Sequence, residues 1–522
     1  MKQKFGTFFI VPFYCNSDKE KHWPDLRIWR KQSKRPTRES KYGEEDKGTI
    51  LPHIMQILQG QTYELDTDVQ PWSIYEFNNG EPDKSPAPFF NGLWKPLHDR
   101  PLSAIIQPEK RDKDGNVTTN ERTVEFTLDC DETLRSPHLF INDKAQTGLL
   151  VFHVGVKSAN NITDLVDLNY TFHKLNDPCI CRCNDFTIPK ESLSNGQSRP
   201  KLEWNVRSLI CLLLGNQLPD ETLEDSNSLV KALVNEDYDT KGDGYTLFNG
   251  ARIHLFTYAT LDEQNQAADF DSDKTLLYLS RCVNGKYSLP VDQIIANNGI
   301  MRTFENISFA SSVEGCSCIA VGQKDKNEAF VSDFPSQLMH RYLWIYLLAL
   351  MQRFTMLNIS GRLLKVEATL EKGKQLQNHK QQDDKKLWEL LNIYKHLKVT
   401  SYWMDVSPFS QHSQFFHFCC HHLHVQDTYD ELDGKMNAIR LVEEHHINQT
   451  LKKQEHNEMR RDRQLSWLVA ILTGVQVIGV AYTISSNMWI TLGVVTPVLI
   501  AGFILWGLIT KNIFDGDKGY KE

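Results

Sequence analysis

Near its end the chain reads LSWLVAILTGVQVIGVAYTI (residues 465–484) and then MWITLGVVTPVLIAGFILWGLIT (residues 488–510). Neither stretch contains a charged residue, and each has about the twenty residues that a helix needs to cross roughly 30 Å of hydrocarbon. Only Ser485-Ser486-Asn487 separates them. A connection this short forces an antiparallel arrangement. The pattern therefore predicts a two-helix transmembrane hairpin over residues 465–510.

The charges on either side of the hairpin predict its orientation. Basic residues flank both ends: Lys452, Lys453, Arg460, Arg461 and Arg463 before it, and Lys511, Lys518 and Lys521 after it. Positive residues stay on the cytoplasmic side during insertion, so we expect both termini in the cytoplasm and a multi-pass protein of the inner (plasma) membrane. The alternative is a buried helical hairpin within a large soluble domain.

The net charge and the cysteine content of the chain indicate which classes of function to expect. The 522 residues carry a formal net charge of -8 and a pI near 6.2, which argues against direct nucleic-acid binding. The eleven cysteines are scattered and odd in number, as expected of reduced thiols in the cytosol.

The predicted secondary structure of the chain changes near residue 335. Before it, short segments rich in Val, Ile, Phe and Tyr predict strands, among them residues 8–13, 149–156 and 275–279, and the pattern of 202–214 predicts a helix. After it the pattern is helical. The fold class predicted is an α+β (α/β-type) cytosolic domain, then a helical stalk and the transmembrane hairpin of an oligomeric channel. The predicted parts are a ligand-sensing domain at 1–334, a helical cytosolic region at 335–426, a stalk helix at 427–464, the hairpin at 465–510 and a tail at 511–522.

The stalk has one narrow apolar stripe, formed by Leu432, Met436, Ile439, Val442, Ile447 and Leu451. No proline interrupts residues 427–484, so the sequence predicts one helix of roughly 85 Å through the stalk and the first apolar stretch. Self-association around a central axis would bury the stripe.

The first apolar stretch has a polar face. It carries Ser466, Thr473, Gln476, Val480, Thr483 and, just beyond, Asn487 at near-helical spacings. Polar groups that face lipid are costly, so the five polar residues are predicted to line a pore, with Val480 completing their row. Hydrogen bonding to neighbouring helices is the alternative.

The long stalk, inner span, short turn and basic tail together resemble the CorA family of divalent-cation channels. The resemblance covers residues 427–522 and implies a homo-oligomer, a pentamer in that family. It departs where the family has Gly-Met-Asn after the inner span, because here Tyr482 is followed by Thr483-Ile484-Ser485. That departure counts against Mg²⁺ selectivity.

The large first domain, which opens with Phe5-Gly6-Thr7-Phe8-Phe9, looks like that of the CorA-type effectors encoded beside type III CRISPR systems. The resemblance implies a channel opened by a nucleotide second messenger, S-adenosylmethionine joined to AMP, which would disrupt the membrane in antiviral defence. Two alternatives stay open: a constitutive Mg²⁺ channel, and a membrane-anchored enzyme or adaptor.

Candidate ligand sites are few. Trp29, Arg30, Lys34 and Arg35 lie in a basic cluster suited to a phosphate and a stacked base, with a solvated loop as the alternative. Weaker metal candidates are residues 237–242, which faintly resemble a Ca²⁺ loop, the C-x-C-x-C run with His173 nearby, and the histidine-rich segment 412–424, for which aromatic packing is the favoured interpretation. The C-x-C-x-C run consists of Cys179, Cys181 and Cys183. In the histidine-rich segment the candidate ligands are His417, Cys420, His421 and His424. No motif of a phosphate-binding loop, serine hydrolase or zinc protease occurs, so we expect no enzyme.

Overall fold

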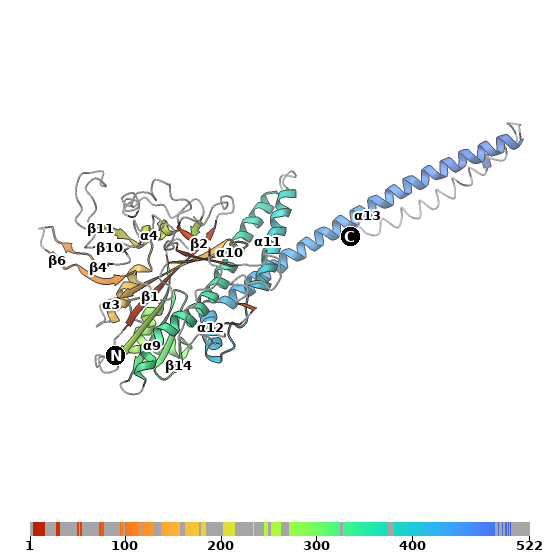
Figure 1. Ribbon diagram of the computed structural model, residues 1–522. Helices are drawn as coiled ribbons and strands as arrows, with labels where there is room; N and C mark the ends of the chain where they lie inside the picture. The colour runs from red at the N-terminus through yellow and green to blue at the C-terminus, as the bar shows by residue number, and fades with distance from the viewer. Residues whose placement is uncertain are drawn as a thin grey trace, which may run out of the picture. The chain divides into compact units, whose positions relative to one another are not determined.

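The computed structural model divides into two compact units, Met1–Asp433 and Gly434–Glu522 (Figure 1). It describes residues 4–15, 28–31, 50–51, 53–54, 72–77, 94, 97, 100–113, 117–128, 137–156, 162–176, 179–183, 202–214, 233, 245–248, 252–262, 271–323, 327–373, 380–485, 489, 493, 496–497, 500 and 502.

The described strands are β1 (Lys4–Cys15), β2 (Trp29–Lys31), β3 (Ser73–Phe77), β4 (Leu102–Gln107), β5 (Lys110–Arg111), β6 (Val117–Thr119), β7 (Arg122–Thr127), β8 (His138–Asn142), β9 (Thr147–Val156), β10 (Ile180–Cys183), β11 (Leu202–Asn205), β12 (Tyr245–Leu247), β13 (His254–Asp262), β14 (Ile300–Phe304), β15 (Ile307–Ser311) and β16 (Gly315–Gly322). The described helices are α3 (Ile162–Phe172), α4 (Val206–Leu213), α7 (Ser272–Ser280), α8 (Val291–Ala296), α9 (Glu328–Gln337), the π-helical segment η7 (Leu338–Tyr342), α10 (Leu343–Gly373), α11 (Lys380–Thr400), α12 (Ser410–His422) and α13 (Val425–Ser485).

A 14-stranded mixed sheet dominates the first unit, counted over the described strands. Its main order is β11-β10-β4-β7-β9-β1-β13-β16-β15-β14, and β12, β2, β3 and β8 pair off this path. β13 and β16 run parallel, while the other described pairs are antiparallel. Strand β1 lies in the middle of the sheet, and its residues 5–13 are buried on both faces. A continuous apolar run of this kind is typical of a strand with layers above and below it.

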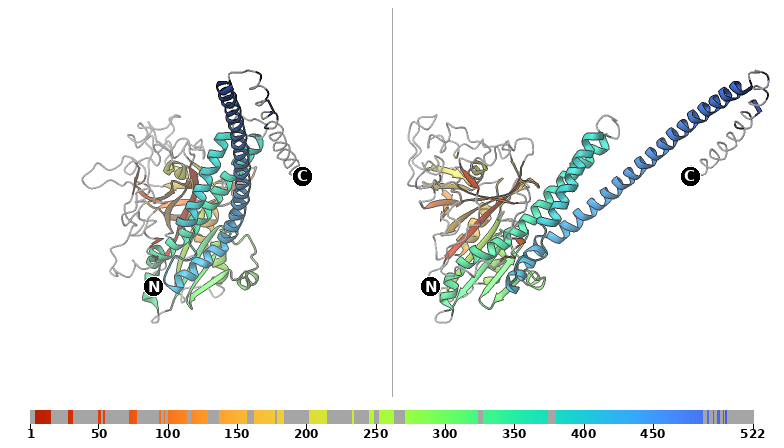
Figure 2. Two further views of the ribbon diagram at one scale, coloured as in Figure 1. Left: turned by 90° about the vertical axis from the view of Figure 1, so that its right-hand side faces the viewer. Right: turned by 45° about the vertical axis from the view of Figure 1, so that its right-hand side comes forward.

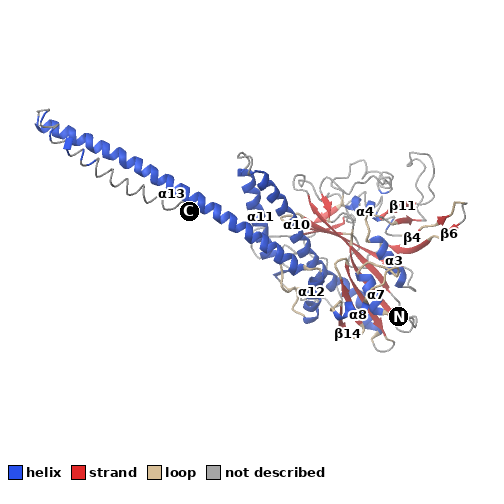
Figure 3. Cartoon of the chain, turned by 180° about the vertical axis from the view of Figure 1, so that it is seen from behind, coloured by secondary structure: helices blue, strands red, loops and turns tan. Residues whose placement is uncertain are grey.

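Helices cover both faces of the sheet, as the alternation of side chains along β1 shows. Phe9 contacts Phe172 of α3, with ring centroids 5.5 Å apart. Phe8 points to the opposite face, where it lies near Phe256, and Phe256 contacts Tyr346 of α10 at 5.5 Å. Helix α10 packs beside α11 (Figure 2), and α3 packs beside α7 (Figure 3). The core is therefore a sheet between two helical layers.

Three polar side chains are buried between β1, β13 and α3. The hydroxyl of Thr7 donates to Asn169 Oδ1 at 2.9 Å, and Asn169 Nδ2 donates to Thr257 Oγ1 at 2.8 Å. The two threonine hydroxyls lie 3.1 Å apart, and all three residues are fully buried. Buried polar groups cost little only when they are hydrogen-bonded, so this trio sets the position of α3 on the sheet.

Replacing Asn169 by Leu should lower the free energy of unfolding by about 2 kcal/mol, because two buried hydrogen bonds are lost and the hydroxyls lose their amide partner. Chemical denaturation followed by circular dichroism measures the change. The triple variant Thr7→Val, Thr257→Val, Asn169→Leu removes every polar member, so it should be less destabilised than the sum of its single substitutions. If the free-energy changes of the three single substitutions add up to that of the triple variant, the three side chains do not act cooperatively.

Two local predictions are corrected. Residues 275–279 are not a strand but lie in α7, whose first turn is capped by the Asp271 side chain accepting from the Lys274 amide at 3.0 Å. Residues 202–214 split into β11 and α4, since Asn205 caps the new helix by accepting from the Ser208 amide at 2.8 Å. In both places a short polar cap decides where the helix begins.

The predicted transmembrane hairpin is also corrected. Among the residues that the structure describes, which omit most of 488–510, no helix is both long and apolar enough to cross a membrane. This finding overturns the fold class with a membrane hairpin and the predicted inner-membrane location. The described fold is instead a large mixed sheet with helices.

The predicted continuity of the long helix is confirmed, because α13 runs without a break from Val425 to Ser485. It extends across the boundary between the two compact units. The helices of 335–426 belong to the same unit as the sheet. Of the predicted stripe, Leu432 and Met436 are buried and Leu451 is exposed, whereas the side chains of Val442 and Ile447 lie outside the described ones.

Candidate functional site: an aromatic cavity at the start of α12

A cavity of about 420 Å³ lies in the first unit, between the end of β14, helix α9, segment η7 and the start of α12. Its lining consists of Phe304, Ala329, Phe330, Asp333, Phe334, Gln337, Arg341, Tyr342, Gln411 and His412. The volume falls within the roughly 300–1,000 Å³ of small-molecule pockets. Apolar rings with a few convergent polar groups are the usual composition of such a pocket.

One wall owes its shape to a change in helix type. Pro335 lies inside α9 and has no N–H to donate. The π-helical segment η7 follows at once, before α10 begins. A π-helical turn bonds i to i+5 and is wider than an α-helical one; such turns occur often at functional sites. Here the segment brings Arg341 and Tyr342 into the cavity wall.

The aromatic rings of the lining form a connected row. Phe304 lies 6.0 Å from Phe330, and Phe330 lies 5.8 Å from Phe334, measured between ring centroids. Phe334 is 6.1 Å from Tyr342, which meets the His412 ring edge-on at 5.0 Å. The two outer rings are open to solvent: Phe304 is 43% exposed and Phe330 46%. An exposed ring at the mouth and buried rings behind it suit a flat, partly apolar ligand.

His412 is the most unusual group in the lining. The residue is 1% exposed, yet neither Nδ1 nor Nε2 has a hydrogen-bond partner among the residues that the structure describes. Burial, and after it the positive charge of Arg341, lower the pKa of His412 to about 4. The imidazole is therefore neutral at pH 7, with one N–H to donate and one nitrogen to accept. An unpartnered polar group in the interior normally costs stability, so a bound ligand is a natural partner for it.

The remaining polar groups complete a binding surface. Arg341 supplies a positive charge, Asp333 a carboxylate, and Gln337 and Gln411 two side-chain amides. Helix α12 begins beside them without a side-chain cap. The lining thus offers donors and acceptors of several kinds around the aromatic row.

Two of the four residues of the predicted ligand cluster, Trp29 and Arg30, lie in the part of the chain that the structure describes. Trp29 is 1% exposed and its indole N–H donates to the Leu213 carbonyl at 3.0 Å, so its ring has no free face for a base. Arg30 is exposed and donates through Nε to Glu76 at 3.0 Å. Lys34 and Arg35 lie outside the described residues.

The six residues predicted to line a pore belong to the second unit. Ser466, Thr473, Gln476, Val480 and Thr483 are exposed on α13, and Asn487 lies outside the described residues. The Thr473 hydroxyl donates to the Val469 carbonyl at 2.8 Å. Apolar side chains on the other faces are exposed as well, for example Leu468 and Val475. Exposure does not distinguish this polar face from the rest of the helix.

The metal candidates have other surroundings. Over the described residues, no group of three or more His, Cys, Asp or Glu side chains is placed to hold a metal ion. Cys181 and Cys183 are buried in β10 and Cys179 is buried just before it, and burial raises the pKa of Cys181. His173 Nδ1 lies 3.2 Å from the Asn169 carbonyl oxygen. His417, Cys420, His421 and His424 form no such group, and residues 237–242 lie outside the description.

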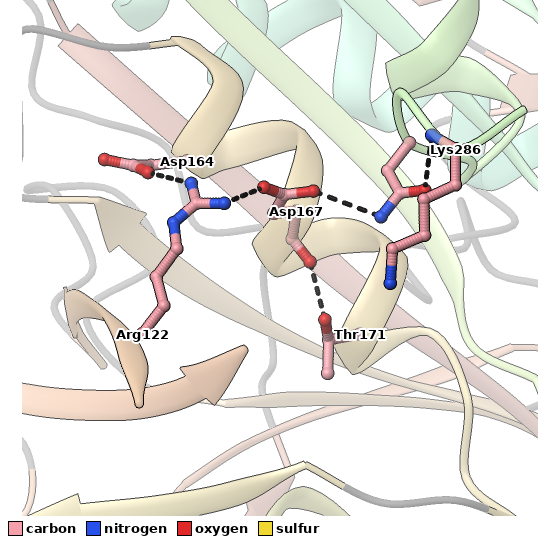
Figure 4. Close-up of polar contacts among 6 residues, drawn as sticks. Arg122, Asp164, Asp167, Thr171 and Lys286 are labelled. Carbon is pink, nitrogen blue, oxygen red and sulfur yellow. Dashed lines mark hydrogen bonds and ion pairs between the residues drawn. The ribbon is translucent and has the colours of Figure 1, made fainter. Parts of the chain in front are cut away.

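A polar cluster on α3 provides a contrast (Figure 4). Arg122 donates to Asp164 at 2.6 Å and to Asp167 at 2.7 Å, and Asn284 Nδ2 donates to Asp167 at 3.2 Å. The hydrogen bond that Arg122 donates to Asp164 is the main cause of a raised pKa for Arg122. These groups satisfy one another and tie β7 and the segment around Asn284 to α3. We interpret the cluster as structural.

Sequence reasoning missed the cavity because its residues are far apart in the chain, from Phe304 to His412. One local signal was present: a proline inside a helical stretch rich in aromatic residues, at Pro335. For residues 412–424 the packing interpretation agrees with the structure, since Phe415 contacts both Phe309 and Tyr342. The unpartnered state of His412 had no counterpart in the sequence pattern.

The fold and the cavity together define a mixed α and β protein with a ligand-sized aromatic pocket. Comparison with protein-family models, curated proteins and solved structures returned no match to this chain. The CorA-type resemblance therefore stays a prediction from the sequence, as do the oligomeric state and the association with type III CRISPR systems.

Proposed function

We propose that this protein is a ligand-responsive effector whose aromatic cavity binds a small nucleotide. The observation that carries this function is the combination of an aromatic row with a buried, unpartnered His412 next to Arg341. By the sequence resemblance, the messenger would be S-adenosylmethionine joined to AMP. The protein is proposed to bind the messenger without chemical conversion.

A nucleotide suits each part of the lining. A base stacks on aromatic rings with about 1–3 kcal/mol per base, and Phe330 and Phe304 present rings at the open end. The amides of Gln337 and Gln411 can donate to and accept from the edge of a base. Arg341 supplies the positive charge that an anionic ligand requires.

The cavity also has a route by which binding can change another part of the molecule. Helix α12 lines the cavity at its first turn and ends at His422. The next carbonyl, that of Leu423, accepts a hydrogen bond from Arg353 of α10. His424 follows with a φ of 52°, and α13 starts at Val425. A ligand that binds more tightly to one position of α12 would thereby favour one position of the α12–α13 junction. The shift can be no larger than the difference in the ligand's affinity for the two positions.

The function is tested by calorimetric titration of the full-length protein with AMP and with the S-adenosylmethionine–AMP conjugate. Replacing Phe330 by Ala should weaken binding about tenfold, because a stacking ring is lost. Since Phe330 is 46% exposed, the fold should be little affected.

The matched control is Trp388→Ala, which removes a 55% exposed ring from α11 outside the cavity lining. Its affinity for both nucleotides should equal that of the wild type. If the wild type binds neither of the two nucleotides, the proposed function is overturned. An equal loss in both variants would place the nucleotide elsewhere.

A further inference from the structure

We infer that the cavity contains a phosphate subsite, formed by His412, Arg341 and the first turn of α12. This inference rests on the proposed function and specifies which part of the ligand binds at which end of the cavity. The stacking rings Phe304 and Phe330 take the base, and the α12 end takes the anion.

The first observation is the start of α12. The helix has 13 residues, and its N-cap position is Phe409, whose side chain makes no capping hydrogen bond. The first amides of a helix commonly have no acceptor within the helix. In α12 the amide of His412 donates to the Phe409 carbonyl at 3.0 Å and that of Phe409 to Ser407 Oγ at 3.3 Å, so the amides of Ser410 and Gln411 are the ones offered to a ligand. The helix dipole adds a partial positive charge at this end, so an uncapped start of this length is suited to an anion. Gln411 and His412, both in the first turn, line the cavity.

The second observation is independent of the helix end. Both ring nitrogens of His412 lack a partner although the residue is 1% exposed, and the ring lies on the cavity wall. A neutral imidazole can donate one N–H to a phosphate oxygen. Hydrogen bonds to charged groups are roughly twice as strong as those between neutral groups. A phosphate therefore satisfies this buried group better than a neutral hydroxyl would.

The third observation is the position of a cation in the lining, whose charged side chains are Arg341 and Asp333. Arg341 lies close enough for its positive charge to disfavour protonation of His412, and both residues belong to the same lining. The acidic lining residue, Asp333, is exposed on α9. The α12 end of the cavity thus combines a cation, a buried donor and a helix start. Planar guanidinium groups bind phosphate through two parallel hydrogen bonds.

The test compares AMP with adenosine, which differ by the phosphate alone, in titrations of the full-length protein. Wild-type protein should bind AMP at least about tenfold more tightly than adenosine. Inorganic phosphate should compete with AMP but not with adenosine. His412→Leu should reduce the AMP preference over adenosine to about twofold, while His412→Gln, which keeps a donor, should retain part of the preference.

The outcomes separate this inference from the proposed function. Equal affinities of the wild type for AMP and adenosine would overturn the phosphate subsite and leave the nucleotide pocket standing. Loss of both affinities to the same extent in His412→Leu, with an unchanged melting temperature, would make His412 a general contact and also overturn the subsite. If neither compound binds the wild type, both ideas fail.

Discussion

Replacing Gly315 by Ala is expected to lower the free energy of unfolding by about 3 kcal/mol, the upper range for overpacking. An added Cβ would lie 2.7 Å from the Leu255 carbonyl oxygen and 3.2 Å from that of Ser280. Both contacts are backbone atoms. Gly315 opens β16 opposite Leu255 in the parallel pair with β13, and Ser280 ends α7, so neither neighbour can retreat without disturbing the sheet or the helix above it.

The matched control is Gly361→Ala in α10. An added Cβ at Gly361 meets no atom within 4 Å, and Ala is favoured over Gly in a helix by roughly 1 kcal/mol. This variant should be as stable as the wild type or slightly more so. Urea denaturation monitored by circular dichroism measures both. A Gly315→Ala protein within 1 kcal/mol of the wild type would show that β13 and β16 are less tightly paired than the structure indicates.

Acid should destabilise the first unit well before its carboxylates titrate. Burial lowers the pKa of His412 to about 4 and that of His254 to about 3, against about 6.5 in an unfolded chain. Because the unfolded state binds protons more readily, the stability is fully present above pH 6.5. It falls as the pH drops toward the folded pKa values.

Between pH 7 and pH 5, each of the two histidines should remove about 2 kcal/mol from the free energy of unfolding. His412→Leu should abolish the contribution of His412 to the fall in unfolding free energy between pH 7 and pH 5. His254→Leu should abolish that of His254. The control His417→Gln changes an exposed histidine of the same helix and should leave the wild-type profile intact. Denaturation curves at pH 7, 6 and 5 provide the measurement. Profiles for His412→Leu and wild type that run parallel would contradict a buried neutral imidazole.

Several elements could be predicted from local pattern. The apolar run of β1 contains enough aromatic and β-branched residues to specify a strand buried on two faces. Helix α13 could be predicted because no proline interrupts it. Helix starts were harder to predict, since each depends on a single capping side chain: Asp271 caps α7, and Asn205 ends β11 and caps α4. The apolar stretch from residue 465 illustrates another limit of sequence-based prediction. Hydropathy indicates that exposing the stretch to water is costly, but it does not distinguish lipid from protein as the surroundings.

The candidate site lay beyond local reasoning because it needs contacts between distant residues. Phe304 comes from a strand, Phe330 from α9, and His412 from a helix more than a hundred residues after Phe304. The row of rings forms only when the sheet edge at β14, the π-helical segment and the start of α12 meet. Trp29 shows the reverse case: beside basic residues in the sequence it suggested a binding surface, yet its ring is buried in the core.

By itself the sequence determined the strands and helices whose periodicity is short in range: the central β1, the helices after residue 335 and the unbroken α13. Only the tertiary structure decided which polar groups lack partners and which rings face a cavity. The physical reason is that strand and helix periodicity depends on neighbours two to four residues away. The burial that leaves His412 neutral depends on α9, η7 and α12 packing together.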